Sequence, residues 1–479
     1  MNLKTIINIL AALLMVMGLS MLFPLIISYF YSEPDFSGHL KSSALCLLAG
    51  LPLWFITRKS RALSSKDGFT IVSLAWLLVA FTGTFPFYFT DSISSFTDAW
   101  FESMSGVTTT GSSILSDIES LPHGVLFWRS FLQWIGGMGI IVFTIAILPL
   151  LGVGGVQLFK AEVPGPVADK IRPRVKETAK ILWMVYIGFT VAETILLSVF
   201  GMPLFDAVCH SFTTMPTGGF STQNASIGAY DSVAIHYIVI LFMFIAGANF
   251  TLHFRALSGN LKGYIKDSEF LTYFGIIMIA TLLIFINITS QNNNWSHDSY
   301  LSSLFQTVSI ITTTGYGSAD YELWPFFSQF LIIILMFIGG MGGSTGGGMK
   351  VARVILLIKF AATETRRMLH SRAIIPIRIG SRFISEDVIR NTLGFFLIYI
   401  SIFTFTTLTL TLLNLDFESA LGAAASAIGN IGPGLGAYGP TDNYSLLHPF
   451  GKWMLSFCML LGRLEIFTIM VLFSRTFWK

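Results

Sequence analysis

A seven-residue pattern that ends in glycine occurs four times in this chain, each time after a short amphipathic segment. Threonine and glycine at these positions suit a backbone whose carbonyl oxygens all point at one axis, where they can replace the water shell of a cation. Four such segments in one apolar chain predict one cation-selective pore built from four quarters. The copies read SGVTTTG, TTMPTGG, SIITTTG and SAIGNIG, at Ser105–Gly111, Thr213–Gly219, Ser309–Gly315 and Ser426–Gly432.

The four copies are unequal, and only their final glycines agree in register. The third continues into Tyr316 and Gly317 and resembles the filter of tetrameric potassium channels, the second contains Pro216, and the fourth has lost every threonine. The prediction therefore rests on backbone carbonyl oxygens. The alternative is that the copies are ordinary turns between short helices, where glycine and threonine are common. The carbonyl groups predicted to bind potassium belong to Thr110, Gly111, Gly218, Gly219, Thr314, Gly315, Ile431 and Gly432.

The segment before each motif is expected to form a short pore helix. Such a helix would point its negative C-terminal end at the ion, which favours a cation. For Asp98 and Asp206, which each precede their motif's glycine by the same interval, helix capping alone is the main interpretation. The expected N-caps are Asp98, Asp206, Ser302, Glu418 and Ser419.

The segment Gly339–Lys350 reads GGMGGSTGGGMK. Each glycine costs a helix about 1 kcal/mol relative to alanine, so a membrane helix must break here. Non-helical backbone at membrane depth needs protein or a water-filled cavity around it. We expect a mobile gate beside the filter; a phosphate-binding loop is the competing idea, but no strand precedes the segment. The predicted gating residues are Gly339, Gly340, Gly342, Gly343, Ser344, Thr345, Gly346, Gly347, Gly348 and Lys350, together with Arg463.

Arg463 and Glu465 are charges within the last apolar segment. A charge at membrane depth usually faces a cavity and has a partner, but residues two apart do not share a helix face. Arg463 is therefore expected to face the pore and hold the glycine-rich segment in a closed state, with an ion pair between helices as the alternative. Arg129 and Glu193 are interpreted as packing or assembly charges, and His210 as a pore-helix residue.

The elements that must position these residues are membrane helices. The chain has 479 residues, of which 53% are apolar and only 11% charged, so lipid must be its solvent. Its long apolar runs exclude a β-barrel. The sequence predicts an all-α integral membrane protein with ten spans. Two N-terminal helices (residues 1–60) precede four pseudo-symmetric helix–pore-loop–helix repeats around a central pore, at 69–151, 178–256, 269–365 and 388–475.

Internal similarity and charge support this layout. IGGMG occurs at Ile135–Gly139 and again at Ile338–Gly342, and each repeat has a further glycine in its second helix, at Gly136, Gly247, Gly339 and Gly462. Nearly all Lys and Arg residues fall in alternate loops, including 160–180 and 350–390, whereas the opposite loops are acidic. The positive-inside rule then places both termini in the cytoplasm and the acidic filter entrance outside. The three scattered cysteines predict neither disulfides nor a zinc site.

Several motifs together closely resemble the membrane subunit of the Trk/Ktr potassium-uptake systems, and the two extra N-terminal helices resemble its TrkH-type branch. The resemblance implies a bacterial inner-membrane homodimer that passes K⁺ through each protomer. It also implies a cytosolic ring of Rossmann-type, TrkA-like nucleotide-binding subunits, a gating loop at 339–350 and a pore arginine at Arg463. The motifs are TTTG (108–111), QWIGGMGII (133–141), LPLLGVGG (148–155), GGFST (218–222), GGSTGGGMK (342–350), NIGPGLG (430–436) and GRLE (462–465).

We therefore expect a potassium-uptake protein with a channel-like pore. K⁺ is expected to be the transported ion, with no covalent or organic cofactor and no nucleic-acid partner. A proton- or sodium-coupled symporter is the alternative; only Arg463, Glu465 and Glu193 lie deep enough to take part in coupling. A membrane enzyme is a third class, but the chain has no nucleophile–base constellation or HExxH-type motif to support it.

Overall fold

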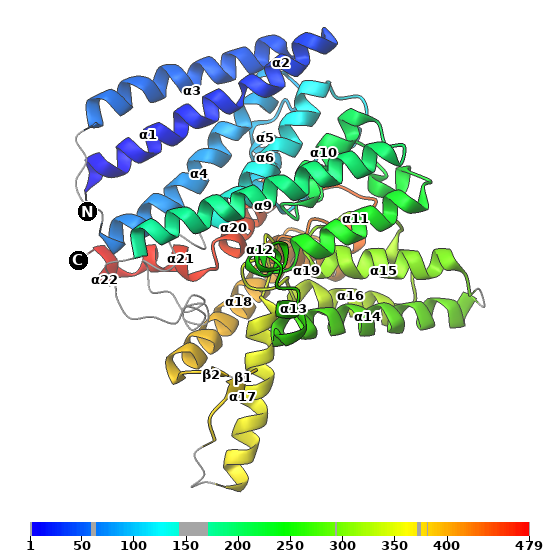
Figure 1. The fold of residues 1–479 in the computed structure, drawn as a ribbon. Helices are drawn as coiled ribbons and strands as arrows, with labels where there is room; N and C mark the ends of the chain where they lie inside the picture. Colours follow the sequence, from blue (N-terminus) through cyan, green and yellow to red (C-terminus); the bar gives the residue numbers. More distant parts are fainter. Residues whose placement is uncertain are drawn as a thin grey trace.

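The computed structural model describes residues 2–58, 64–142, 171–292, 295–370, 375–380 and 382–478. The motif at 148–155 and part of the basic loop at 160–180 lie outside these ranges. The described chain is almost entirely helical (Figure 1). Six helices are long and apolar enough to cross a membrane, and two bent helix pairs could add two more spans, so the total of ten stays a prediction. The six are Leu3–Tyr31, Phe36–Thr57, Lys66–Phe89, Glu177–Val199, Ser268–Gln291 and Glu386–Leu412.

The N-terminal helices form a hairpin along one edge of the molecule (Figure 1). Small residues let the two arms approach closely: a Cβ atom on Gly18 would lie 2.9 Å from the Leu47 side chain, and one on Gly50 would lie 2.9 Å from Met15. Ser43 donates a 2.7 Å hydrogen bond to the Gly18 carbonyl across the hairpin. The elements are α1 (Leu3–Ser20), α2 (Leu22–Tyr31) and α3 (Phe36–Thr57).

Four repeats follow, and each contains a long helix, a short pore helix, the glycine-ending segment found in the sequence and a second helix. The first repeat has α4 (Ser65–Phe89), α5 (Phe96–Val107) and α6 (His123–Val142). The second has α9 (Ile171–Val199), α10 (Leu204–Thr214), η3 (Ser226–Ala229), α11 (Val233–Ala246) and α12 (Phe250–Leu257), and α13 (Lys262–Lys266) leads out of it.

The third and fourth repeats have the same order of elements. The third comprises α14 (Ser268–Asn292), α15 (His297–Ile311), η4 (Tyr321–Leu323), α16 (Phe326–Phe337) and α17 (Val351–Leu369). The fourth comprises α18 (Glu386–Leu412), α19 (Phe417–Gly429), η5 (Gly436–Tyr438), α20 (Pro449–Arg463), α21 (Phe467–Met470), η6 (Val471–Phe473) and α22 (Arg475–Trp478).

At the end of the third repeat, α17 extends away from the body of the molecule beside a small antiparallel hairpin (Figure 1). The hairpin pairs β1 (Arg378–Ile379) with β2 (Arg382–Phe383). Ile377 next to it packs with Leu356 of α17 and Val388 of α18 in a small apolar cluster. The hairpin therefore ties the third repeat to the fourth.

Two large apolar clusters each join several repeats. One joins the first and fourth repeats to the N-terminal hairpin and includes Cys209 of the second, and the other joins the second and third and includes Ala425, Ile431 and Leu435 of the fourth. The pore helices lie at the centre of these clusters: every residue of α5 from Ala99 to Val107 is buried, and so is every residue of α19 from Ala420 to Gly429 except Leu421. The four pore helices are thus enclosed by the longer helices.

Candidate functional site

All four pore helices end in one hydrogen-bond pattern. A residue one to three positions past the helix has a left-handed backbone, and the next amide donates to the carbonyl five residues earlier, which is a Schellman motif. This motif normally uses glycine at the left-handed position, but here the residues are Thr109, Thr217, Thr313 and Asn430, with φ of 52°, 58°, 61° and 54°. The closing bonds are Thr110–Ser105 (2.8 Å), Gly218–Thr213 (2.8 Å), Thr314–Ser309 (2.9 Å) and Ile431–Ser426 (3.0 Å).

In each repeat, the glycine predicted from the sequence comes directly after the residue whose amide closes this pattern. We call this glycine and the two residues before it a filter segment: residues 109–111, 217–219, 313–315 and 430–432. All four glycines have positive φ, a region that L-residues rarely adopt. The φ angles are 86° at Gly111, 78° at Gly219, 79° at Gly315 and 108° at Gly432. The four unequal sequences therefore adopt one repeated backbone form.

The four filter segments contact one another in a closed ring. In each contact, the glycine of one segment lies against the carbonyl oxygen of the middle residue in the next. A Cβ atom on Gly219 would lie 1.9 Å from the Thr314 oxygen, and one on Gly315 would lie 1.8 Å from the Ile431 oxygen. A Cβ atom on Gly111 would lie 2.2 Å from the Gly218 oxygen, and one on Gly432 would lie 2.8 Å from the Thr110 oxygen. Any side chain at these glycines would displace the ring.

Two predicted carbonyl oxygens already accept hydrogen bonds from the protein. The Gly218 oxygen accepts one from the Gln133 amide at 2.8 Å, and one lone pair remains. The Gly432 oxygen accepts bonds from three hydroxyl groups, which fill its capacity. The donors are Ser112 (2.9 Å), Ser426 (2.7 Å) and Tyr444 (3.2 Å).

The capping prediction for the pore helices was wrong in detail. Asp98, Asp206, Glu418 and Ser419 lie in the first turns of their helices, and Ser302 lies well inside α15. A cap must precede the first helical residue so that its side chain can accept the free amides. The residues at the cap positions, directly before the helices, are Ser95, Pro203, Ser296 and Asp416, and all but Pro203 accept a backbone amide through the side chain.

The glycine-rich segment breaks the helix between α16 and α17, as predicted. Its backbone is held by short contacts to three repeats. Thr345 donates to the Met215 oxygen at 2.9 Å, the Gly347 amide donates to Thr313 Oγ1 at 2.6 Å, and a Cβ atom on Gly347 would lie 2.5 Å from the Gly429 oxygen. The segment therefore lies directly against the C-terminal ends of the pore helices.

Arg463 connects this segment to the remaining repeat. It is 2% exposed, and its guanidinium group donates to the Thr345 oxygen at 2.6 Å and to the Gly136 oxygen of α6 at 3.4 Å. Within the described residues it forms no ion pair. Glu465 instead pairs with Arg353 of α17 at 2.6 Å, so the expectation that Arg463 and Glu465 do not pair is confirmed.

Two of the repeated glycines in the second helices allow a close contact between helices. A Cβ atom on Gly136 would lie 2.0 Å from the Val107 oxygen, and one on Gly462 would lie 2.2 Å from the Ile428 oxygen. Val107 and Ile428 lie at equivalent positions, in the last turns of their pore helices. Glycine thus lets the second helices of the first and fourth repeats touch the ends of their own pore helices.

Comparison with known proteins agrees with this architecture. The TrkH family model, described as a cation transport protein, matches residues 38–479. The chain belongs to the TrkH family. Over the full length of both chains, it is 41% identical to the Trk system potassium uptake protein TrkH of Salmonella typhimurium and 42% identical to that of Vibrio parahaemolyticus. The chain also matches the crystal structure of the potassium transporter TrkH from Vibrio parahaemolyticus over the full length of both chains, with a TM-score of 0.92 and 39% sequence identity.

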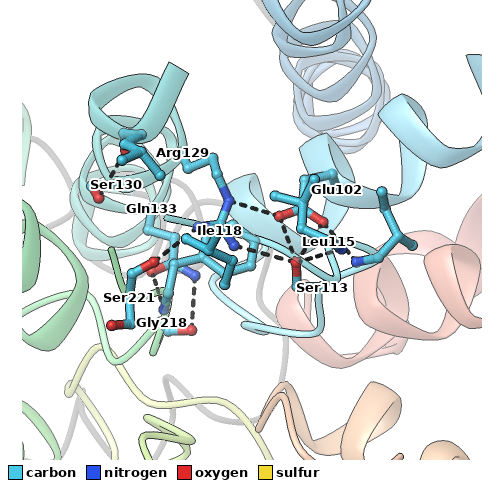
Figure 2. Close-up of polar contacts among 12 residues, drawn as sticks. Glu102, Ser113, Leu115, Ile118, Arg129, Ser130, Gln133, Gly218 and Ser221 are labelled. Carbon is cyan, nitrogen blue, oxygen red and sulfur yellow. Dashed lines mark hydrogen bonds and ion pairs between the residues drawn. The ribbon is translucent and has the colours of Figure 1, made fainter. Parts of the chain in front are cut away.

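Sequence reasoning undervalued three residues beside the ring of this TrkH-family protein (Figure 2). Arg129, interpreted as a packing charge near a helix end, is 1% exposed and pairs with the fully buried Glu102 at 2.9 Å. Gln133, one turn further along α6, contacts the second filter segment. A glutamate in an amphipathic pore helix and an arginine in an apolar span were the available signals, because such charges need partners.

Proposed function

We propose that this chain takes up potassium across the bacterial inner membrane through a channel-like pore lined by the four filter segments. The observation that carries the proposal is the closed ring, in which four copies of one backbone form meet glycine to carbonyl. Oxygen rings of this kind replace the hydration shell of a cation. The TrkH relatives are named as potassium uptake proteins, which supports K⁺ as the transported ion.

The proposed ligands are the carbonyl groups of the filter segments. Thr110, Thr314 and Ile431 are the strongest candidates, and Gly218 can contribute its second lone pair. The carbonyl groups of Gly111, Gly219 and Gly315 would add further positions along the axis. The Gly432 oxygen, with three hydroxyl donors, is assigned to the wall of the ring instead.

The glycine-rich segment and Arg463 form the proposed gate. The segment contacts the second, third and fourth repeats, and Arg463 extends the contact to the first. A cationic guanidinium beside the path would also repel a permeating cation. The arrangement described above fits a closed state, and opening requires the segment to leave these contacts.

The assembly proposal follows from the family. We propose a homodimer with both termini in the cytoplasm, controlled by a cytosolic ring of nucleotide-binding subunits. The basic residues of α17 and its hairpin, such as Arg366, Arg367 and Arg378, lie on the side that the charge pattern assigns to the cytoplasm. They would suit such a partner.

The deciding experiment is growth of a potassium-uptake-deficient bacterium at low external K⁺, followed by bilayer recording of the purified protein. Rescue, together with unitary currents far above carrier turnover, is expected. A Gly315→Ser variant should lose discrimination of K⁺ from Na⁺. An absence of rescue and of K⁺-selective current would overturn the proposal.

A coupled symporter is the second candidate, and Glu193 favours it. This carboxyl group is fully buried in α9, and neither of its oxygens has a hydrogen-bond partner within the described parts of the chain. Such a group in a membrane span is a candidate proton carrier. Coupling predicts that a proton gradient alone drives Rb⁺ accumulation into proteoliposomes and that Glu193→Gln abolishes it; currents at channel rates would exclude it.

A further inference from the structure

One position in the pore helices is used to hold the chain that leaves the filter. Nine residues before the filter glycine, the four repeats have Glu102, His210, Gln306 and Ala423. The first three bind the segment after their own filter. Glu102 accepts bonds from Ser113 Oγ at 3.0 Å and from the Ile114 amide at 3.0 Å. His210 Nε2 lies 3.0 Å from Ser221 Oγ, and Gln306 donates to the Ala319 oxygen at 3.0 Å.

In the first repeat, an ion pair adds to this contact (Figure 2). The guanidinium group of Arg129 donates to Glu102 through Nε at 2.9 Å and to Ser113 Oγ through Nη2 at 3.3 Å. Seven residues before the second-helix glycine, where α6 has Arg129, the other repeats have buried apolar residues. These are Ile240, Ile332 and Leu455. The charge pair is therefore specific to one quarter of the ring.

The same arginine also reaches the second repeat. Its Nη1 donates to the Ser221 oxygen at 3.0 Å, and its guanidinium lies 4.2 Å from the centre of the Phe220 ring. One turn along α6, Gln133 donates to the Gly218 oxygen at 2.8 Å and accepts from the Phe220 amide at 3.2 Å. Three residues of the second repeat, Gly218, Phe220 and Ser221, are thus held from α6.

We propose that Glu102, Arg129 and Gln133 form a brace that sets the spacing between the first and second filter segments and thereby helps to determine ion selectivity. This inference rests on the proposed function of the filter. The three side chains touch the filter backbone and the chain that follows it, so they are positioning residues. A buried ion pair adds little net stability over an apolar pair of similar volume. The planar guanidinium group, with its several hydrogen-bond donors, instead fixes the partners in place.

The contribution of the brace should appear as a change in permeability ratio. Groups that orient the ligands of a metal ion change its affinity by about 10- to 100-fold when they are lost. The brace reaches two of the four segments, so we expect a fall near the low end, about tenfold. The effect should be shared by variants that break different contacts of the brace while leaving the filter sequence intact.

The experiment measures the K⁺/Na⁺ permeability ratio of the purified full-length protein under bi-ionic conditions in planar bilayers. Glu102→Gln removes the charge, and Arg129→Lys keeps the charge but loses the fork that bridges the two repeats. Both should lower the ratio about tenfold. Gln133→Met should also lower it, and because it leaves no buried charge unpaired, it is the deciding variant if the other two do not fold.

Asp98→Asn is the matched control. Asp98 lies on the same pore helix and forms an ion pair with Lys452 at 2.5 Å, but it does not contact the filter or the segment after it. Its loss should leave the permeability ratio unchanged. The brace is refuted if folded Gln133→Met and Glu102→Gln proteins keep the wild-type ratio, or if Asp98→Asn lowers it equally. If Gly315→Ser lowers the ratio while the brace variants do not, only the brace fails; if wild type is unselective, the proposed function fails.

Discussion

Replacing Arg463 by methionine tests the gate most directly. Methionine keeps the unbranched apolar stem but removes the guanidinium group, which donates to the Thr345 oxygen at 2.6 Å and to the Gly136 oxygen at 3.4 Å. Because no carboxylate within the described residues pairs with Arg463, the substitution leaves no unpaired acid behind. The change is therefore confined to the link between α20, the glycine-rich segment and α6.

The size of the effect follows from the shorter bond. A hydrogen bond from a charged donor contributes about 1.5–3 kcal/mol, and the bond at 3.4 Å adds little. At 1.4 kcal/mol for each factor of ten, losing the bond to Thr345 shifts the equilibrium between closed and open states by roughly 10- to 150-fold. Basal flux should rise by up to that factor and level off once the pore is mostly open.

The assay is uptake of Rb⁺ into proteoliposomes that contain the purified protein without any cytosolic partner. Lys452→Met is the matched control, because Lys452 is a buried basic residue on the same helix. It binds Asp98 and the Ser445 oxygen and makes no contact with the glycine-rich segment. Its loss removes the same charge from α20 but should leave basal flux at the wild-type level.

Two results would refute the reasoning about Arg463. Unchanged or reduced flux in a folded Arg463→Met protein would mean that the bond to Thr345 does not hold the closed state. An equal rise in Lys452→Met would mean that any loss of positive charge from α20 increases conduction, through a general electrostatic effect. Folding of both variants is checked by size-exclusion chromatography and by helical circular dichroism.

Three further predictions follow. Gly315→Ala should lower K⁺/Na⁺ discrimination in bilayer recordings, because its φ is 79° and the new Cβ would lie 1.8 Å from the Ile431 oxygen; a wild-type ratio would contradict it. Gly136→Ala should lower the free energy of unfolding by about 1–3 kcal/mol by overpacking α6 against Val107, as thermal melts would show. Burial and the nearby carboxylates raise the pKa of Glu322 to about 7. Its negative charge is therefore lost as pH falls through 7, so inward cation conductance at low K⁺ should drop there in wild type but not in Glu322→Gln.

Most of the structural features that the sequence predicts correctly lie at glycine residues. At Gly111, Gly219, Gly315 and Gly432, a fixed interval to the pore helix and the absence of a side chain are enough to indicate the repeated backbone turn. The density of glycine in 339–348 similarly forces the break between α16 and α17, because helix propensity is a local property. These features depend on residues that are close in sequence.

The features that the sequence did not indicate depend on distant residues. The hydroxyl donors that fill the Gly432 oxygen include Ser112 from another repeat. Likewise, Arg129 meets Glu102 from a different helix and Ser221 from a different repeat. Pattern and spacing along the chain do not indicate which side chains of different helices or different repeats come together, so these partners could be identified only from the fold.

The inequality of the four repeats has a physical consequence. In a pore of four identical chains, every quarter must bear the same side chains, so a gate or a brace is present four times or not at all. Here the third repeat alone contributes the glycine-rich segment, the fourth contributes Arg463, and the first contributes Glu102 and Arg129. The backbone of the ring stays nearly fourfold while its supports differ. Selectivity and gating can then be altered by separate substitutions, and the brace and gate variants above should each change one property without the other.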